Sequence, residues 1–150
     1  MNRKLLGRLL LSLVLLATIV AEIGFTWIGW TGEHIFNPDW HPHARFHAAQ
    51  LVSFVIAMSI VDLWLVWRRS LESRIVILAA TAFPVLYWGA EFFAFFVPGT
   101  SPSPVLANPN TFRLLGFEVY GNLFFSGAMI ALSVLACLLT GAVGGREREA

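Results

Sequence analysis

Four long apolar runs constrain the fold of this chain more than any other feature. They cover residues 5–30, about 47–67, 75–97 and about 116–143. A helix needs about 20 consecutive, mostly apolar residues to cross a bilayer, and each run is long enough. The first run is also too long for the apolar region of a signal peptide, so we expect it to be retained. The sequence therefore predicts four membrane spans.

The composition agrees with a membrane protein of one domain, residues 1–150. Apolar residues make up 57% of the chain and charged residues 13%, and the mean hydropathy is +0.72. A soluble domain of 150 residues carries less apolar and more charged sequence than this. The net charge of +1 gives no reason to expect a nucleic-acid partner, and a single cysteine, Cys137, excludes a disulfide within the chain.

The basic residues predict the orientation. Eight of the ten Lys and Arg residues lie near the N-terminus, between the second and third runs, or near the C-terminus: Arg3, Lys4, Arg8, Arg68, Arg69, Arg74, Arg146 and Arg148. The loops at 31–46 and 98–115 hold only Arg45 and Arg113. Since basic residues stay on the cytoplasmic side, we expect both termini in the cytoplasm and both longer loops outside a plasma or inner membrane.

The short connection between the second and third spans favours an antiparallel helical hairpin. The simplest fold is then an all-α, antiparallel four-helix transmembrane bundle. Gly7 and Gly127 are among the glycines that give the first and fourth helices small surfaces for close approach. A single chain and an oligomer both fit this pattern.

Acidic residues inside the spans indicate a polar pocket. Glu22, Glu91 and Glu118 fall roughly 5 to 12 Å below the outer surface, at 1.5 Å per helical residue. Polar residues of the second and fourth helices reach the same depth: His47, Gln50 and Asn122. Such side chains are costly in lipid, so we expect them to face inward in a pocket open to the outside. Asp62 lies nearer the cytoplasmic end, where Arg68 or Arg69 is its expected partner.

Three purposes for this polar layer remain open. It is a structural network in which the carboxylates pair with Arg45 and Arg113, a coupling site for transport, or a ligand pocket. In the ligand pocket, Glu22, Glu91 and Glu118 are the candidate catalytic proton donors and acceptors. The candidate ligand-binding residues are Gln50, Asn122, Tyr87, Trp88 and Tyr120. Acids beside aromatic rings suit a flat hydrophobic molecule or a cation.

The histidines cluster in the first outer loop and at the start of the second helix. His43 and His47 are four residues apart, so they share one face if that helix begins near Pro42. This spacing is typical of a divalent metal site for zinc, iron or manganese. The alternative is helix capping, with Asp39 as the N-cap and Pro42 in the first turn. Capping and surface hydrogen bonds also remain the simpler interpretation for His34 and His41.

The segment NPDWHPHARFHAAQ, Asn37 to Gln50, resembles the signature of a family of small four-span membrane proteins of unknown function. This resemblance implies the topology but no activity. The architecture is also similar to the emopamil-binding and sterol isomerase class, whose bundles carry a His and acidic residues for acid/base isomerisation of a lipid. That similarity concerns the fold alone.

Two shorter segments resemble other membrane families. IVAEIGFTW, around Glu22, is similar to the first helix of small multidrug-resistance transporters, which exchange protons for cationic drugs at a membrane Glu. The long outer loops depart from that family. RFHAAQ is similar to a region of the glutathione-using membrane eicosanoid enzymes, but Gln50 is not at the position of their Asn.

Taken together, these patterns favour binding or acid/base conversion of a small lipophilic molecule in the outer half of the bilayer, with or without a metal. A proton-coupled small-molecule transporter and a non-catalytic accessory subunit of a membrane complex are the alternatives. Whether the chain is an enzyme stays open.

Overall fold

The computed structural model describes residues 2–27, 35–68, 73–102 and 111–142, and within them the chain is mostly helical. The helices are α1 (Arg3–Ala21), α2 (Pro42–Trp67), α3 (Ser73–Ala94) and α4 (Gly121–Thr140), and the π-helical segment η1 (Glu22–Trp27) continues α1. Two short antiparallel strands, β1 (Thr111–Leu114) and β2 (Phe117–Tyr120), precede α4.

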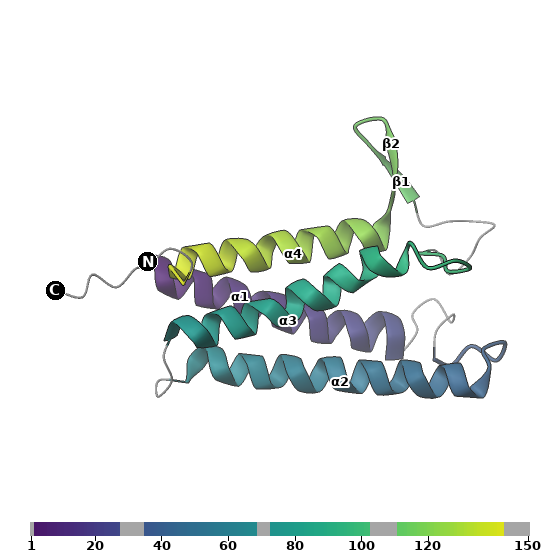
Figure 1. The fold of residues 1–150 in the computed structure, drawn as a ribbon, viewed down its shortest axis with the longest axis horizontal. Coiled ribbons are helices and arrows are strands. Elements are labelled where there is room, and N and C mark those ends of the chain that lie inside the picture. Colours follow the sequence, from purple (N-terminus) through teal and green to yellow (C-terminus); the bar gives the residue numbers. More distant parts are fainter. Residues whose placement is uncertain (1, 28–34, 69–72, 103–110, 143–150) are drawn as a thin grey trace.

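Among the described residues, four helical segments are long and apolar enough to cross a membrane, and they contain 20 to 26 residues. At 1.5 Å per residue they measure about 30 to 39 Å, against about 30 Å for a bilayer core. Figure 1 shows them side by side, with α1 beginning and α4 ending at the same end. We call this the inner end, and the opposite end, where α2 and α4 begin, the outer end.

Side chains cap the starts of the first two helices. Asn2 Oδ1 accepts a hydrogen bond from the Lys4 backbone N–H at 3.0 Å. At α2, His41 Nδ1 accepts from the His43 N–H at 3.3 Å, and Pro42 occupies the first turn. The prediction for Pro42 is therefore confirmed. The prediction of Asp39 as the cap is wrong, because Asp39 lies in a preceding turn that the Trp40 N–H closes onto the Asn37 carbonyl.

Apolar side chains from all four helices form the core near the inner half of the bundle. Its fully buried members include Leu11, Leu15, Val66, Ile77, Ala80 and Ala136. At Gly7 an added Cβ atom would lie 2.6 Å from the Ala136 carbonyl oxygen and 2.7 Å from Thr140 Cγ2. The absence of a side chain at Gly7 thus lets α1 and α4 touch, as the glycine pattern predicts.

The outward faces of the helices are apolar as well. Leu13, Leu86 and Phe93 are 60%, 72% and 75% exposed. Large apolar side chains on every outward face need an apolar surrounding, because water would not solvate them favourably. These faces fit a chain surrounded by lipid.

The structure corrects the predicted all-α fold at one place and the span bounds at others. Residues 111–120 form a β-hairpin, and its second half, residues 116–120, is where the sequence predicts the start of the fourth helix. That helix begins at Gly121. Leu115 and Gly116 make the two-residue turn of the hairpin with φ of 51° and 89°. The third helix ends at Ala94, before the predicted 97, while residues 28–30 of the first predicted span lie outside the described residues.

We expect Gly7→Ala to lower the thermal midpoint of the detergent-purified protein, with a loss of about 1 to 3 kcal/mol from overpacking. Gly89→Ala is the matched control, since a Cβ atom at Gly89 meets nothing within 4 Å. Equal midpoints for the two variants would show that α1 and α4 are not in close contact at Gly7.

Candidate functional site

Glu22 is the best-buried acidic side chain in the outer half of the bundle, with 6% of its surface exposed. The Tyr87 hydroxyl of α3 donates a hydrogen bond to Glu22 Oε1, and the side chain of Thr26 also hydrogen-bonds the Glu22 carboxyl group. Glu22 stands where α1 passes into the π-helical segment η1. Such wide turns often mark functional positions within helices.

A second acid lies beside this pair. Glu91 of α3 interacts electrostatically with both Glu22 and Tyr87. Its Oε2 atom accepts a hydrogen bond of 3.4 Å from Asn122 Nδ2 of α4. We call Glu22, Tyr87, Glu91 and Asn122 the carboxyl cluster. The structure therefore brings together four of the residues that the sequence assigns to the polar layer or its ligand.

Aromatic rings form the wall next to the carboxyl cluster. Trp88 is buried, and its Nε1–H donates to Thr18 Oγ1 of α1 at 3.1 Å. The Trp88 ring centroid lies 4.9 Å from that of Tyr87 and 5.2 Å from that of Phe125, both in edge-on contact. Tyr87 and Trp88 are thus placed together beside the acids.

The contacts found for Arg45 and Arg113, the arginines expected to pair with the acids, do not involve Glu22 or Glu91. The Arg45 Nε–H donates to the Trp40 carbonyl at 3.1 Å, and Arg113 faces Glu118 across the hairpin. The hydrogen bonds found on Glu22 come from the neutral groups of Tyr87 and Thr26. Two neighbouring carboxyl groups held by neutral donors in an apolar setting are suited to hold a proton or a cation.

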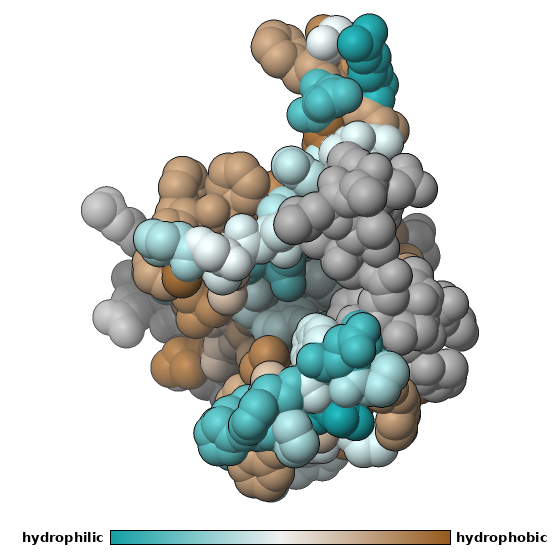
Figure 2. Space-filling model, turned by 90° about the vertical axis from the view of Figure 1, so that its right-hand side faces the viewer, coloured by the Kyte–Doolittle hydropathy of each residue, from teal (hydrophilic) through white to brown (hydrophobic). Residues whose placement is uncertain are grey.

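Figure 2 looks onto the outer end of the bundle. Hydrophilic residues gather there on the end of α2 and on the hairpin. Between the ends of the helices the surface is hollowed, and hydrophilic colour is visible inside the hollow.

Three other candidate residues do not join the cluster. Glu118 is exposed on β2, so the prediction that it lies within the fourth helix is wrong. Tyr120 precedes α4 as its N-cap residue, with its ring 6.3 Å from that of Phe95. Gln50 is exposed and lies with His47, Leu51 and Phe54 along an open surface groove of about 340 Å³ on α2, away from the cluster. Glu118 and Tyr120 lie away from the carboxyl cluster because they belong to the hairpin, and α4 begins later than the apolar run suggests.

The His43 and His47 rings meet on one face of α2, as the spacing predicts. Their Nε2 atoms are 3.0 Å apart. Two imidazole nitrogens at about 2.0 to 2.1 Å from one tetrahedral ion would lie about 3.3 Å apart, so the pair could supply two ligands. The described residues contain no group of three His, Cys, Asp or Glu side chains that could hold a metal. A metal thus stays a prediction, and His34 lies outside the described residues.

A family model matches residues 13–148 of the chain. The chain belongs to the DUF6640 family, a family of unknown function. The DUF6640 match includes the whole carboxyl cluster and both His43 and His47. No curated protein and no solved structure matches the chain. The expected membership of a family without assigned function is confirmed, while the similarity to the sterol isomerase class stays an analogy.

In this DUF6640 chain a further acid is buried away from the cluster. Asp62 of α2 is 3% exposed, and neither its Oδ2 atom nor the nearby Ser59 Oγ has a hydrogen-bond partner among the described residues. The guanidinium of Arg68, one of its expected partners, lies over the Trp64 ring at 4.4 Å. Arg69 is outside the described residues. Sequence reasoning located Asp62 but missed that it is buried with an unpartnered oxygen.

We expect Tyr87→Phe to lower the thermal midpoint, because the buried Glu22 carboxyl group loses its donor from α3, at a cost of about 1 to 3 kcal/mol. Tyr120→Phe removes the same hydroxyl outside the carboxyl cluster and should leave the midpoint unchanged. Differential scanning fluorimetry of both variants in one detergent makes the comparison. An unchanged midpoint for Tyr87→Phe would show that the bond to Glu22 does not hold α1 to α3.

Proposed function

We propose that this DUF6640 protein binds a small lipophilic molecule carrying a cationic or protonatable group, and exchanges a proton with it at the carboxyl cluster. One observation carries the proposal: Glu22 is buried, held by neutral donors, and next to a second carboxyl group. Neighbouring carboxyl groups in an apolar site are the usual means of moving a proton to or from a bound molecule.

The proposal places the four helices across a plasma or inner membrane, with the inner end in the cytoplasm. The support is the excess of Lys and Arg at the inner end and the apolar outward faces of the helices. The carboxyl cluster then lies in the outer half of the bilayer. A lipophilic molecule would enter from the outer surface, through the hollow visible in Figure 2.

Each residue of the cluster has a distinct role in this proposal. Glu22 accepts a proton from the bound molecule or donates one to it, and Tyr87 orients the Glu22 carboxyl group through its hydrogen bond. Glu91, oriented by Asn122, supplies the second carboxyl group: when Glu22 accepts a proton from one atom of the molecule, a protonated Glu91 donates its own proton to another atom and becomes a carboxylate. The rings of Trp88 and Phe125 give an apolar wall.

Binding of tetraphenylphosphonium, a lipophilic cation, tests the role of the acids. We expect saturable binding to the detergent-purified protein by isothermal titration calorimetry, with affinity at least about tenfold lower in Glu22→Gln and Glu91→Gln. Glu118→Gln removes the same charge from the exposed hairpin and should bind like the wild type.

Equal affinity in all four proteins would contradict a binding role for the cluster. Absence of saturable binding in the wild type would likewise contradict the proposed preference for a cation, and would favour the non-catalytic accessory subunit among the alternatives. The midpoint of each variant, measured beforehand, separates loss of binding from loss of folding.

A proton-coupled transporter is the second candidate, favoured by Asp62. Transport needs a proton step on each side of the bilayer, and Asp62 supplies a buried carboxyl group of α2 nearer the inner end. In proteoliposomes with an imposed pH gradient, a transporter should accumulate tetraphenylphosphonium. We expect Asp62→Asn to abolish this accumulation while preserving binding, whereas Glu22→Gln abolishes both. No accumulation by the wild type would leave binding or conversion as the function.

A further inference from the structure

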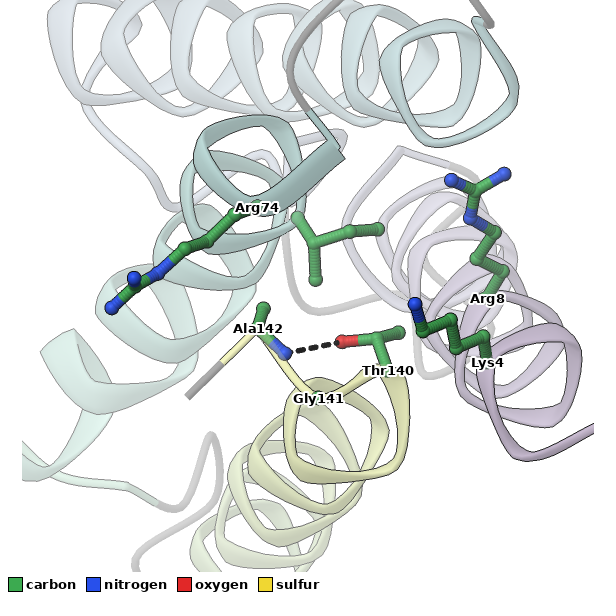
Figure 3. A pocket seen from close by; sticks show the side chains of 7 residues that line it. Lys4, Arg8, Arg74, Thr140, Gly141 and Ala142 are labelled. Atoms are coloured by element: carbon green, nitrogen blue, oxygen red, sulfur yellow. Dashed lines mark hydrogen bonds between the residues drawn. The ribbon is translucent and has the colours of Figure 1, made fainter. Parts of the chain in front are cut away.

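A small cavity lies at the inner end of the bundle, far along α1 from the carboxyl cluster. It measures about 90 Å³ and opens between α1, α3 and α4, where it is lined by Lys4, Arg8, Arg74, Ile77, Thr140, Gly141 and Ala142. Figure 3 shows Thr140, Gly141 and Ala142 on the side of α4. Thr140 Oγ1 donates to the Cys137 carbonyl at 2.6 Å and accepts from the Ala142 N–H at 3.4 Å, which closes the chain over the end of α4.

Three of the seven lining residues are cationic, and none of the seven is acidic. In Figure 3 the Lys4 ammonium points toward Thr140 across the cavity. Arg8 and Arg74 stand on opposite sides, with their guanidinium groups turned outward at the rim. Positive charge from two helices therefore surrounds one opening.

Close packing of the helices produces this convergence. The contact at Gly7, three residues after Lys4 and directly before Arg8, holds this part of α1 against the last turn of α4. Cations are favourable at the C-terminus of α4, where the helix dipole is negative. Lys4, however, also lies in the first turn of α1, where the dipole is positive and no acidic residue is present. An anion in the opening would offset that unfavourable arrangement.

Membrane orientation alone does not explain the cavity. A positive inner end requires only that basic residues lie near the membrane surface, in any arrangement. It does not require a Lys and two Arg residues to line one opening together with the Thr140 hydroxyl group and an apolar wall, Ile77. Basic pockets between membrane helices on the cytoplasmic side are typical sites for lipid phosphate groups.

We propose that this cavity binds a phosphate group, supplied by the headgroup of an anionic phospholipid in the inner leaflet. A water takes up about 30 Å³, so a cavity of about 90 Å³ has room for a group of phosphate size. Lys4, whose ammonium points into the opening, supplies a cation for the phosphate, and Arg8 at the rim carries the paired donors that suit phosphate oxygens. The acyl chains would lie along the apolar outer faces of the helices. The carboxyl cluster takes no part in this site.

Native mass spectrometry of the protein purified in a non-ionic detergent tests the site. We expect dioleoyl phosphatidylglycerol to bind with one tight equivalent per chain and at least tenfold more tightly than dioleoyl phosphatidylcholine. Lys4→Gln and Arg8→Gln should each weaken phosphatidylglycerol binding about fivefold. Arg3→Gln is the matched control, because Arg3 begins the same helix without lining the cavity, and its effect should be under about twofold.

A competition with sodium phosphate distinguishes the source of the group. If millimolar phosphate fails to displace the lipid, the headgroup is the ligand; if it displaces the lipid, the phosphate site stands and free phosphate is its ligand. Equal binding of the two lipids would overturn the proposal. So would an equal loss in Arg3→Gln, which would indicate attraction to the overall charge of the inner end.

Discussion

Hydrogen bonds between side chains join α1 to its neighbours at three depths in the bundle. Trp67 donates to Ser12 at 2.9 Å, Trp88 donates to Thr18 at 3.1 Å, and Tyr87 donates to Glu22. In lipid, burial of apolar surface between helices yields little, because the acyl chains are as apolar as the side chains. Close contacts and hydrogen bonds decide the packing instead. The positions of α2 and α3, and with α3 that of Glu91, therefore depend on these polar side chains of α1.

The same helix positions both proposed sites. Lys4 and Glu22 are separated along the helical chain by about 27 Å at 1.5 Å per residue, close to the thickness of a bilayer core. The acids of the carboxyl cluster lie in the outer half of the bundle, and the cations that line the cavity lie at the inner end. The ligands that we propose for the two sites, an organic cation and an anionic headgroup, match these charges. Gly7 keeps the inner end closed against α4, while η1 widens the helix at Glu22.

Much of the fold and part of the site could be predicted from the chain alone. Run length and composition located the four helices, and the depths of Glu22 and Glu91 in two different spans predicted that they share one layer. The hairpin was missed because Phe112, Leu114, Phe117 and Val119 are as apolar as a helix start, and because its turn, Leu115-Gly116, lacks the Asn or Asp that usually precedes such a glycine. Because the hairpin was missed, Glu118 was predicted to lie within the fourth membrane helix, whereas it is exposed on β2 opposite Arg113.

By itself, the sequence determined how many apolar helices the chain forms, where their charged ends lie and that Glu22, Asp62 and Glu91 fall inside them, since these properties depend on local composition and on helix rise. Only the tertiary structure decided which polar side chains meet. Asn122 bonds Glu91, Tyr87 bonds Glu22, and Arg45 turns to a backbone carbonyl instead of an acid. The physical reason is that such contacts depend on the rotation of each helix about its axis and on its distance from the next, which close packing sets at positions such as Gly7.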